Sequence, residues 1–593
     1  MTPGPTPTDV TGRLRLADFS TLTDALDHAA TGRSGFNFYS SRGDLIDVLP
    51  YRDLRERAMA LARRMLRAGW VPGERIALVA ETGAGFVSAF FACQYAALVP
   101  VPLPTPAAFG GRGGYVDQIR PLLASARPTA VLAPDPFLAM IGQATGAFTP
   151  RVIGTFEQFD GIPDGGTDLP RVGHDDLSYL QFSSGSTRSP TGVAVTQRAL
   201  LANVRCIVRD ALDVRAGDRS LSWLPFYHDM GLVGFLLAPL ATQASADYVA
   251  PDEFARRPLV WPMLIARNGA TISYGPSFGY DLCARRALKT SIDHLDLSTW
   301  RVAGIGGDMI RPAVLARFAE VFAGCGFRRE AFVASYGMAE ATLGISFAPL
   351  DRGIETDRID LDLLRTAGRA MPAAAERARV REFVICGRVL PGHELEIRGA
   401  DDGVLGEREE GRIVIRGPSV MREYFANREE TGRVLSPDGW LDTGDLGYLV
   451  GGSVVVTGRS KDLILFNGRN VWPQDLEWAV EHQVADARQG DVAAFSVDGA
   501  DAERVVVLVQ CRTDDEALRE ALRRAVAEVV LATAGLRCTV VLVAHNALPR
   551  TSSGKLSRSR ARQMYLASSR AEAPVDVNQA PLASDSSAAA MPA

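Results

Sequence analysis

The feature that most constrains the fold is a short, β-branched apolar run that ends in glycine or proline and recurs along the chain. Such runs occur at 130–134, 247–251, 271–275 and 301–307. Between them lie patterns of helical spacing, such as 52–69, which stops at Gly69. Strands that alternate with helices are typical of mostly parallel sheets covered by helices. The sequence therefore predicts an α/β fold.

The chain divides into regions of different composition. Residues 1–14 are rich in Pro and Thr, and 567–593 are rich in Ala, Ser and Pro, so we expect both to be flexible or disordered. We expect a large domain over 15–457, a hinge at 458–461 and a small α+β domain over 462–566. No internal repeat of fixed period is visible, and no further globular module is expected after the small domain.

Composition excludes several classes of protein. Apolar residues make up 47% and charged residues 22% of the 593, as in ordinary globular proteins. A net charge of −5 gives no support for a general nucleic-acid binder. Seven cysteines without a C-x-x-C pair fit a reducing compartment. The N-terminus lacks the apolar core of a signal peptide, so we expect a cytoplasmic protein.

The most apolar stretch, 86–103, does not read as a membrane span. It is interrupted by Ser88, Gln94 and two prolines. A span needs about 20 consecutive, mainly apolar residues. The stretch therefore predicts a buried helix followed by a strand.

The segment 180–193, LQFSSGSTRSPTGV, is the first that suggests chemistry. Small hydroxylated residues with glycine let backbone N–H groups turn inward and hold an anion. Taken alone, the composition fits a flexible surface linker at least as well. The loop is not a Walker A motif, because Val193 follows Gly192 where a lysine is required. The candidate phosphate-binding residues are Ser183, Ser184, Gly185, Ser186 and Thr187.

Five further segments follow this loop in a specific order. They read LPFYHDMGL (224–232), SYGMAEATL (335–343), GWLDTGDLGYL (439–449), GRSKDLILFNGRN (458–470) and LPRTSSGKLSR (548–558). Over about residues 15 to 565, the set resembles the adenylate-forming superfamily of acyl-CoA synthetases, luciferases and adenylation domains. The resemblance implies a large N-terminal domain of β-sheets with flanking helices and a small, mobile α+β C-terminal domain.

Within this superfamily the sequence is most similar to the fatty acyl-AMP ligases. The loop has Arg188 and Thr191 where acyl-CoA synthetases tend to have STGxPKG, and the second motif has the His-Asp-Met-Gly form. The segment 468–477 matches the pattern Arg-Asn-x-x-Pro-Gln-Asp of these ligases. Residues 347–380 stand where they carry an inserted segment, and its alternating charged and apolar residues suit a packed element.

The resemblance implies a two-step reaction. With ATP and Mg²⁺, a fatty acid becomes an acyl-adenylate, and the acyl group passes to the phosphopantetheine thiol of a holo acyl carrier protein. Such a reaction feeds polyketide, nonribosomal peptide or lipid biosynthesis. The alternative is a fatty acyl-CoA synthetase with CoA as acceptor, against which the inserted segment argues. A non-catalytic binder with the same fold is a third hypothesis. The chain length of the acyl group and the cognate carrier protein do not follow from the sequence.

The resemblance assigns the charged residues of the reaction. Lys555 matches the catalytic lysine that contacts the substrate carboxylate and the α-phosphate; alone, it reads as a solvated surface lysine. Glu340 matches the Mg²⁺ ligand, assisted by Thr187, although a glutamate at a helix N-terminus is also stabilised by the dipole. His228 is expected to contact the carboxylate or close the acyl pocket, against a purely structural role.

The nucleotide contacts follow from the same match. Asp445 is expected to accept hydrogen bonds from both ribose hydroxyls, although an Asx turn explains it too. Arg459 is the second ribose or phosphate contact, and Tyr336 is expected to stack on adenine. Lys461 matches the hinge position, against an exposed turn lysine. The remaining cofactor-binding positions are Gly307, Asp308, Met309, Gly337 and Met338, of which the first three depart from the more common Gly-Ala-Glu-Pro.

The acyl pocket is less defined. Residues 276–283 match a segment near the substrate tunnel of the family. There, Gly279 and Cys283 are small enough to admit a chain, but core packing explains both equally well.

Overall fold

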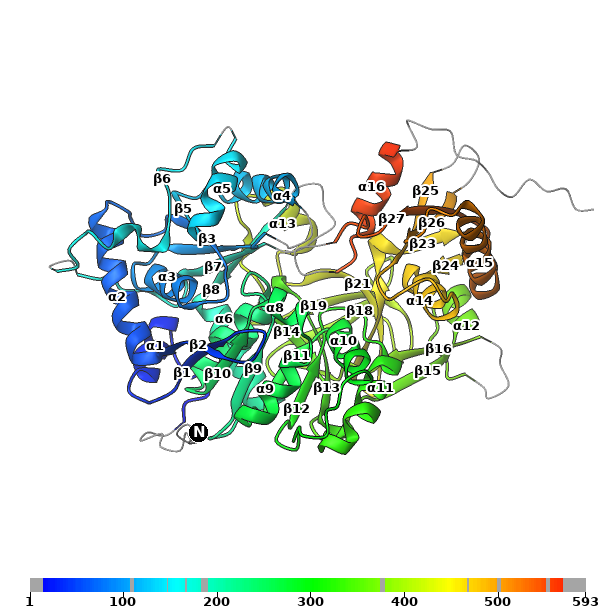
Figure 1. Ribbon diagram of the computed structural model, residues 1–593, viewed down its shortest axis with the longest axis horizontal. Coiled ribbons are helices and arrows are strands. Elements are labelled where there is room, and N and C mark those ends of the chain that lie inside the picture. Colours follow the sequence, from blue (N-terminus) through cyan, green and yellow to red (C-terminus); the bar gives the residue numbers. More distant parts are fainter. Residues whose placement is uncertain are drawn as a thin grey trace, which may run out of the picture. The chain divides into compact units, whose positions relative to one another are not determined.

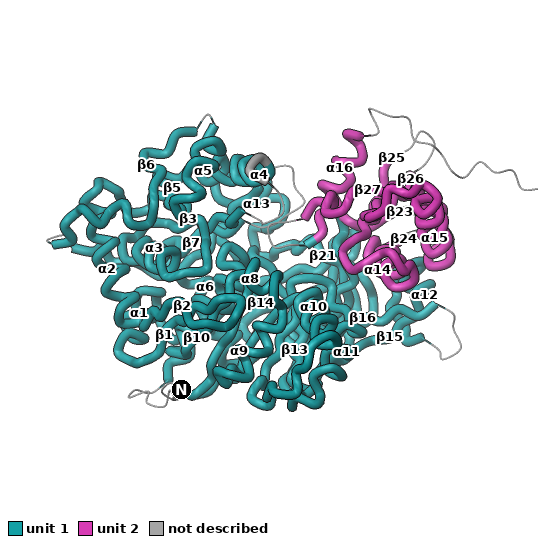
Figure 2. Tube along the Cα trace, viewed as in Figure 1, with its two compact units in different colours: residues 1–461, 552–555 teal, residues 462–551, 556–593 magenta. Residues whose placement is uncertain are grey.

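The computed structural model describes two compact units. The larger comprises Met1–Lys461 with Ser552–Lys555, and the smaller comprises Asp462–Thr551 with Leu556–Ala593 (Figure 2). The division falls directly after Lys461, the last residue of the expected hinge. The described residues are 14–106, 111–146, 148–165, 168–182, 190–373, 379–466, 469–498, 503–550 and 555–568.

The larger unit contains a nine-stranded sheet with the order β17-β14-β13-β12-β11-β9-β10-β1-β2. Its six central strands, from β13 to β1, are parallel, and β14, β17 and β2 add antiparallel edges. The α/β prediction is confirmed. The strands are β1 (Gly35–Tyr39), β2 (Leu45–Pro50), β9 (Arg219–Ser222), β10 (Ser245–Val249), β11 (Ile272–Gly275), β12 (Val302–Ile305), β13 (Phe332–Gly337), β14 (Gly344–Phe347) and β17 (Arg388–Val389).

Four smaller sheets complete the described part of this unit. A parallel sheet has the order β4-β3-β5-β6, with β3 (Arg75–Val79), β4 (Val99–Leu103), β5 (Ala130–Leu132) and β6 (Val152–Gly154). A second joins β20 (Glu423–Tyr424), β8 (Gly192–Thr196) and β7 (Leu177–Phe182). An antiparallel sheet contains β18 (Glu394–Arg398), β19 (Gly411–Arg416), β21 (Leu441–Val450) and β22 (Ser453–Arg459). Strands β15 (Thr356–Asp360) and β16 (Val380–Val384) pair with each other.

Helices cover these sheets because their apolar residues recur at helical spacing. Helix α2 buries Leu54, Ala58, Leu61 and Met65 on one face and packs against α3 (Figure 1). The helices of this unit are α1 (Leu22–Ala29), α2 (Tyr51–Arg67), α3 (Ala84–Tyr95), α4 (Gly111–Ala126), α5 (Leu138–Ala144), α6 (Gln197–Arg205), α7 (Ala238–Ala241), α8 (Pro251–Arg256), α9 (Val260–Asn268), α10 (Ser277–Ala287), α11 (Pro312–Phe322), α12 (Leu361–Ala367) and α13 (Arg428–Val434).

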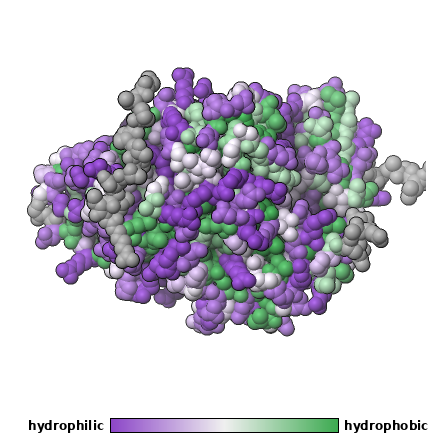
Figure 3. Space-filling view, turned by 90° about the horizontal axis from the view of Figure 1, so that it is seen from below, coloured by the Kyte–Doolittle hydropathy of each residue, from purple (hydrophilic) through white to green (hydrophobic). Residues whose placement is uncertain are grey.

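The apolar stretch 86–103 forms α3 and β4, as predicted. In helix α3, every residue from Phe86 to Tyr95 except Ser88 is buried, and β4 is buried throughout. In the described part of the chain, no helix is both long and apolar enough to cross a bilayer. Figure 3 shows a face of the molecule on which hydrophilic and hydrophobic residues are interspersed.

The inserted segment 347–380 is structured in its described part. Strand β15 leads into α12, which ends at Gly368 with a left-handed φ of 63°. Leu361 and Leu364 of α12 are buried. Arg408 pairs with Asp357 of β15 at 2.9 Å, and Tyr448 donates a hydrogen bond to the same carboxylate at 2.8 Å. The segment is therefore packed onto the sheet that contains β21.

The smaller unit is an α+β structure with its own core. Its three-stranded sheet has the order β25-β26-β27, and β23 and β24 form a separate pair. Arg558 of α16 forms ion pairs with Glu477 of α14 at 2.7 Å and with Asp462 at 2.9 Å. The elements are β23 (Ile464–Phe466), β24 (Arg469–Val471), α14 (Pro473–Gln483), β25 (Val492–Asp498), β26 (Glu503–Cys511), α15 (Glu516–Ala534), β27 (Cys538–Ala544) and α16 (Arg558–Ser568).

Candidate active site

A cavity of about 570 Å³ lies in the larger unit, which includes Lys555. Its lining comes from the end of β13, the turn that follows it, the β21–β22 hairpin and β20. Segments far apart in the sequence thus meet around one space. The predicted site residues that line it are His228, Gly307, Tyr336, Gly337, Met338, Glu340, Arg459, Lys461 and Lys555.

Other predicted residues lie beside the cavity or outside the described residues. Asp445 contacts the lining residue Tyr336, whereas Asp308 and Met309 are not among the lining residues. The residues predicted to hold phosphates, 183–187, are outside the described residues, as are 188 and 189. Phe182, directly before these residues, and Thr191, two positions after them, do line the cavity.

The β21–β22 hairpin and β13 bring the predicted ribose and adenine contacts together. Asp445 stands opposite Arg459 in the hairpin, and Nε of Arg459 lies 3.3 Å from its carboxylate. The hydroxyl of Tyr336 donates a hydrogen bond to Oδ2 of Asp445 at 2.7 Å. Burial raises the pKa of Tyr336, and the Asp445 carboxylate adds to the effect. The tyrosine is therefore a neutral donor that fixes the carboxylate.

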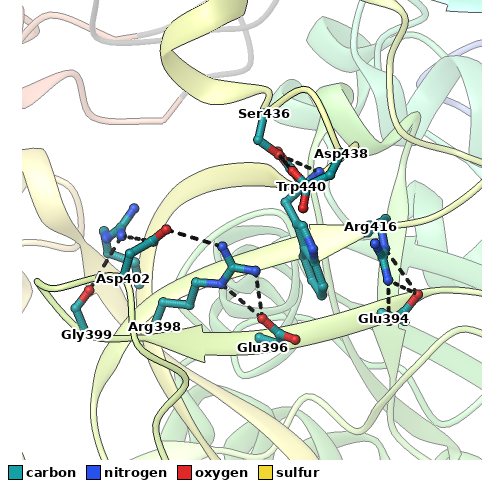
Figure 4. Close-up of polar contacts among 10 residues, drawn as sticks. Glu394, Glu396, Arg398, Gly399, Asp402, Arg416, Ser436, Asp438 and Trp440 are labelled. Atoms are coloured by element: carbon teal, nitrogen blue, oxygen red, sulfur yellow. Dashed lines mark hydrogen bonds and ion pairs between the residues drawn. The ribbon is translucent and has the colours of Figure 1, made fainter.

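Trp440, the residue before β21, is held between two arginines (Figure 4). The guanidinium carbons of Arg398 and Arg416 each lie 4.8 Å from the centroid of a Trp440 ring. Both arginines are also paired with glutamates of β18: Arg398 with Glu396 at 2.8 Å and Arg416 with Glu394 at 2.8 Å. Each guanidinium cation is attracted to the electron-rich face of the indole ring. This arrangement fixes the start of the strand that leads to the candidate site.

Glu340 lies in η7 (Ala339–Ala341), the turn between β13 and β14. It is 6% exposed, and its Oε1 accepts a hydrogen bond from the hydroxyl of Tyr424 at 2.8 Å. Burial raises the pKa of Glu340, and the Tyr424 hydrogen bond opposes that rise. The turn closes through Thr342, which adopts φ 71°. A positive φ is rare and unfavourable for a β-branched residue. Contacts with neighbouring segments must therefore hold Thr342 in this conformation.

Lys555 lies over Gly307. A Cβ built on Gly307 would stand 3.7 Å from Nζ of Lys555, and Gly307 has φ +77°. Burial lowers the pKa of Lys555, and the carboxylates of Asp308 and Asp229 offset part of that shift. A cation in low dielectric acts strongly on a nearby negative charge. Lys555 is therefore placed to act on an anion in the cavity.

His228 is paired with Asp229, a residue that the sequence analysis did not single out. Nδ1 of His228 lies 2.7 Å from Oδ1 of Asp229, which also accepts the N–H of Met230 at 2.7 Å. Burial alone would raise the pKa of Asp229, but the charges of His228 and Lys555 outweigh it and lower the pKa. The HDMG motif could have indicated this ion pair, because an aspartate directly follows the histidine in it.

The acidic residues fit a cation that arrives with phosphates. In the described part of the chain, no three His, Cys, Asp or Glu side chains cluster as a metal site. Mg²⁺ is commonly held by one or two carboxylates together with substrate phosphates. Glu340, a buried carboxylate in the turn between β13 and β14 that lines the cavity, suits that kind of binding.

The other part of the cavity is apolar. Two π-helices contribute to it: η3 (Cys206–Ala211) and η4 (Met230–Leu237). Such helices are rare and are frequent at functional sites. The apolar lining residues are Ile207, Leu212, Phe235, Ile272, Leu343 and Phe347. Ligand pockets are usually mostly apolar with a few polar groups.

Gly279 and Cys283 lie in the core instead. A Cβ on Gly279 would come within 2.5 Å of the Trp223 ring. The thiol of Cys283 is buried against the carbonyl of Pro258 at 3.2 Å. Neither is among the residues that line the cavity, so packing accounts for both small side chains.

Known proteins match this arrangement over almost the whole chain. The family model of the AMP-binding enzymes matches residues 39–425. A Caulobacter vibrioides protein with the provisional name acyl-CoA synthetase is 52% identical, over 95% of this chain and 98% of its own. The medium-chain fatty acid–acyl carrier protein ligase JamA of Moorena producens is 30% identical, over 93% and 95%. A solved structure from a study of fatty acyl-adenylate ligases of E. coli and L. pneumophila has 44% identity and a TM-score of 0.90, covering 94% of this chain and 100% of that one.

Proposed function

The chain belongs to the AMP-binding enzymes and, among them, to the fatty acyl-AMP ligases, and we propose that it transfers the acyl group of its adenylate to an acyl carrier protein. ATP and Mg²⁺ drive the first step. The observation that carries the proposal is a single cavity with an apolar part and a charged part that holds Glu340 and Lys555. A fatty acid needs the apolar part, and a nucleotide needs the charged one.

In the first step, the fatty acid carboxylate attacks the α-phosphorus of ATP and pyrophosphate leaves. Negative charge then grows on phosphate oxygens, and preorganised cations and N–H donors stabilise it. We assign this role to Lys555, whose amine lies in the cavity. Asp445, whose carboxylate accepts a hydrogen bond from Tyr336, is proposed to hold the ribose hydroxyls, and Tyr336 is proposed to stack on the adenine.

Mg²⁺ would neutralise phosphate charge and orient the leaving pyrophosphate. Glu340 supplies the carboxylate for it, and Thr187 is proposed as its neighbour on the phosphate loop. His228, which pairs with Asp229 and lines the cavity, is proposed to meet the acyl carboxylate.

In the second step, the phosphopantetheine thiol attacks the acyl carbonyl, a thioester forms and AMP leaves. The proposal is supported by JamA, which is named for this acceptor and aligns over nearly the whole chain. It is also supported by the packing of β15 and α12 in the described part of 347–380. Lys461 is proposed as the hinge between the two steps. The alternative acceptor is CoA, and the name of the C. vibrioides relative, an acyl-CoA synthetase, is in favour of this alternative.

One assay separates these functions. Pure protein is given ATP, Mg²⁺ and a panel of fatty acids, followed by either CoA or a phosphopantetheinylated carrier protein. We expect pyrophosphate release and acyl-adenylate with at least one fatty acid, then acylated carrier protein with little acyl-CoA by mass spectrometry. Efficient acyl-CoA formation would establish the alternative, and the absence of any adenylate would leave only a binder.

A further inference from the structure

Tyr424 connects two parts of the candidate site that are far apart in the sequence. Its hydroxyl donates to Oε1 of Glu340 at 2.8 Å, and the residue is 9% exposed and lines the cavity. Tyr424 lies in β20, which pairs with β8 through Val193. The N–H of the next residue, Phe425, donates to Gly192 at 2.7 Å. One side chain thus joins the Glu340 turn to the strand that follows the Ser/Thr loop.

The segment before Tyr424 holds the same turn from its backbone. The N–H of Met421 donates to the carbonyl of Glu340 at 2.7 Å. The hydroxyl of Thr342 donates to the carbonyl of Ser419 at 2.7 Å, and Ser419 in turn contacts Nε2 of His393 at 2.6 Å. These contacts fix the main chain of the turn, and Tyr424 holds its carboxylate.

We propose that Tyr424 is a positioning residue that orients the Glu340 carboxylate toward the divalent cation carried by ATP. The inference rests on the proposed role of Glu340. A glutamate carboxylate rotates broadly about its last torsion, so a buried one needs a donor to keep a single orientation. Partners that orient a metal ligand in this way typically contribute 10- to 100-fold to metal affinity.

The test is Tyr424→Phe, which removes one oxygen and keeps the ring. Mn²⁺ binding is measured by electron paramagnetic resonance in the presence of a non-hydrolysable ATP analogue. We expect the Kd for Mn²⁺ to rise at least tenfold, while binding of the analogue without metal stays unchanged. The Mg²⁺ concentration that half-saturates pyrophosphate release should rise in parallel.

Tyr448→Phe is a matched control. Tyr448 is also a buried tyrosine whose hydroxyl donates to a carboxylate, Asp357, at 2.8 Å, but it is not among the cavity residues. Both variants lose one such hydrogen bond, so their melting temperatures should fall by similar amounts. Only Tyr424→Phe should change the affinity for Mn²⁺. Equal Mn²⁺ affinities in the two variants would overturn the inference.

A double-mutant cycle with Glu340→Gln shows whether Tyr424 acts through Glu340. In that background, Tyr424→Phe should cost less than twofold in Mn²⁺ affinity. A full tenfold loss there would mean that Tyr424 acts by another route, and the inference would be wrong. Because Mn²⁺ binding needs no fatty acid, the result is independent of whether the protein forms an acyl-adenylate.

Discussion

Lys555 is one of only three lysines among the 64 basic residues of the chain; the other two are Lys289 and Lys461. Arginine therefore serves almost every other basic position. A lysine ammonium is a compact point charge whose pKa shifts readily in a buried site, whereas a guanidinium is planar and always charged. The amine at Lys555 fits the small space over Gly307.

Replacement of Lys555 tests its charge directly. Lys555→Ala should lower the rate of pyrophosphate release at least ~100-fold, because a stabilising charge is lost from the transition state, while ATP binding by calorimetry persists. Lys289→Ala, which removes an exposed lysine, should leave the rate unchanged. Near-normal release by Lys555→Ala would exclude it from the mechanism.

The pH dependence gives a second measurement on the same residue. Burial lowers the pKa of Lys555 below its usual 10.5, so its cation is lost at a lower pH than that of a free lysine. Catalysis needs the cation, and the rate of wild type should therefore decline on the alkaline side below pH 10.5. Lys555→Arg keeps its charge, so whatever activity it retains should not decline there.

The sequence predicted the charged residues of the site better than their partners. Glu340, Asp445 and Lys555 lie in segments with recognisable patterns, and the structure brings all three to the cavity region. Tyr424 carries no such signal, because its role arises only when β20 pairs with β8. Asp229 was visible beside His228, but a neighbour in sequence does not reveal a 2.7 Å contact.

At the scale of elements, the inserted segment is attached to the sheet of β21 and β22. Arg408 binds Asp357 and the carbonyl of Ala370, at 2.9 and 2.7 Å. The N–H of Cys386, just after β16, donates to Val454 of β22 at 2.8 Å. Strand β22 ends at Arg459, two residues before the boundary between the units. The segment itself is therefore anchored to β21 through Asp357, and β21 pairs with the strand that leads to the expected hinge.

Removal of the segment should change the choice of acceptor. A deletion of residues 350–378, which takes away β15 and α12, should leave acyl-adenylate formation measurable and raise acyl-CoA formation. Each ~1.4 kcal/mol of lost restraint shifts a conformational population tenfold. The measurement is acyl-CoA yield by mass spectrometry at equal adenylate yield. Asp357→Ala, which removes one anchor, should give a smaller rise.

A deletion variant that adenylates normally and gains no acyl-CoA activity would show that the segment is not the barrier. The acceptor would then be chosen in the channel that admits the pantetheine.

The elements themselves were predictable to different degrees. Helices such as α2 and α15 follow from apolar residues at helical spacing, and β25, β26 and β27 from β-branched runs. The π-helices η3 and η4 were not predicted, because nothing in an apolar segment such as 230–237 distinguishes their wider turns from an α-helix. The order of the nine-stranded sheet is set by contacts between distant segments, which periodicity does not encode.

At the scale of the whole molecule, the half-buried carboxyl group of Glu410 links stability to pH. Glu410 accepts a hydrogen bond from Thr457 of β22 at 2.5 Å, and its N–H donates to Gly368 at 2.8 Å. Burial raises its pKa from 4.5 to about 7, and the Thr457 hydroxyl opposes that rise. Between these values the folded protein holds a proton that the unfolded chain releases.

This raised pKa sets the sign of the pH dependence. The contribution of Glu410 is most favourable below pH 4.5 and is lost as the pH rises to about 7, by up to about 1.4 kcal/mol per unit. In Glu410→Gln that loss is absent, so its melting temperature relative to wild type should rise from pH 5 to pH 7 and then level off. Calorimetry at several pH values measures this.

Glu409→Gln is the control for the same experiment. Glu409 is the neighbouring residue and pairs with Arg369 at 3.2 Å. The variant Glu409→Gln therefore loses an ion pair but keeps the carboxyl group of Glu410. Because this variant keeps Glu410, its melting temperature should still fall relative to that of Glu410→Gln between pH 5 and pH 7. A course for Glu410→Gln that runs parallel to wild type would mean that Glu410 titrates normally in the folded protein.

The β21–β22 hairpin has a consequence for the engineering of chimeric enzymes. Asp445 and Arg459 face each other in it, and the unit boundary follows only two residues later, after Lys461. A fusion point placed inside the hairpin would take Asp445 from one parent enzyme and Arg459 from the other. The junction between parents therefore belongs after Lys461. Because Lys555 groups with the larger unit, its surroundings at Asp229 and Asp308 must be matched to whichever parent supplies it.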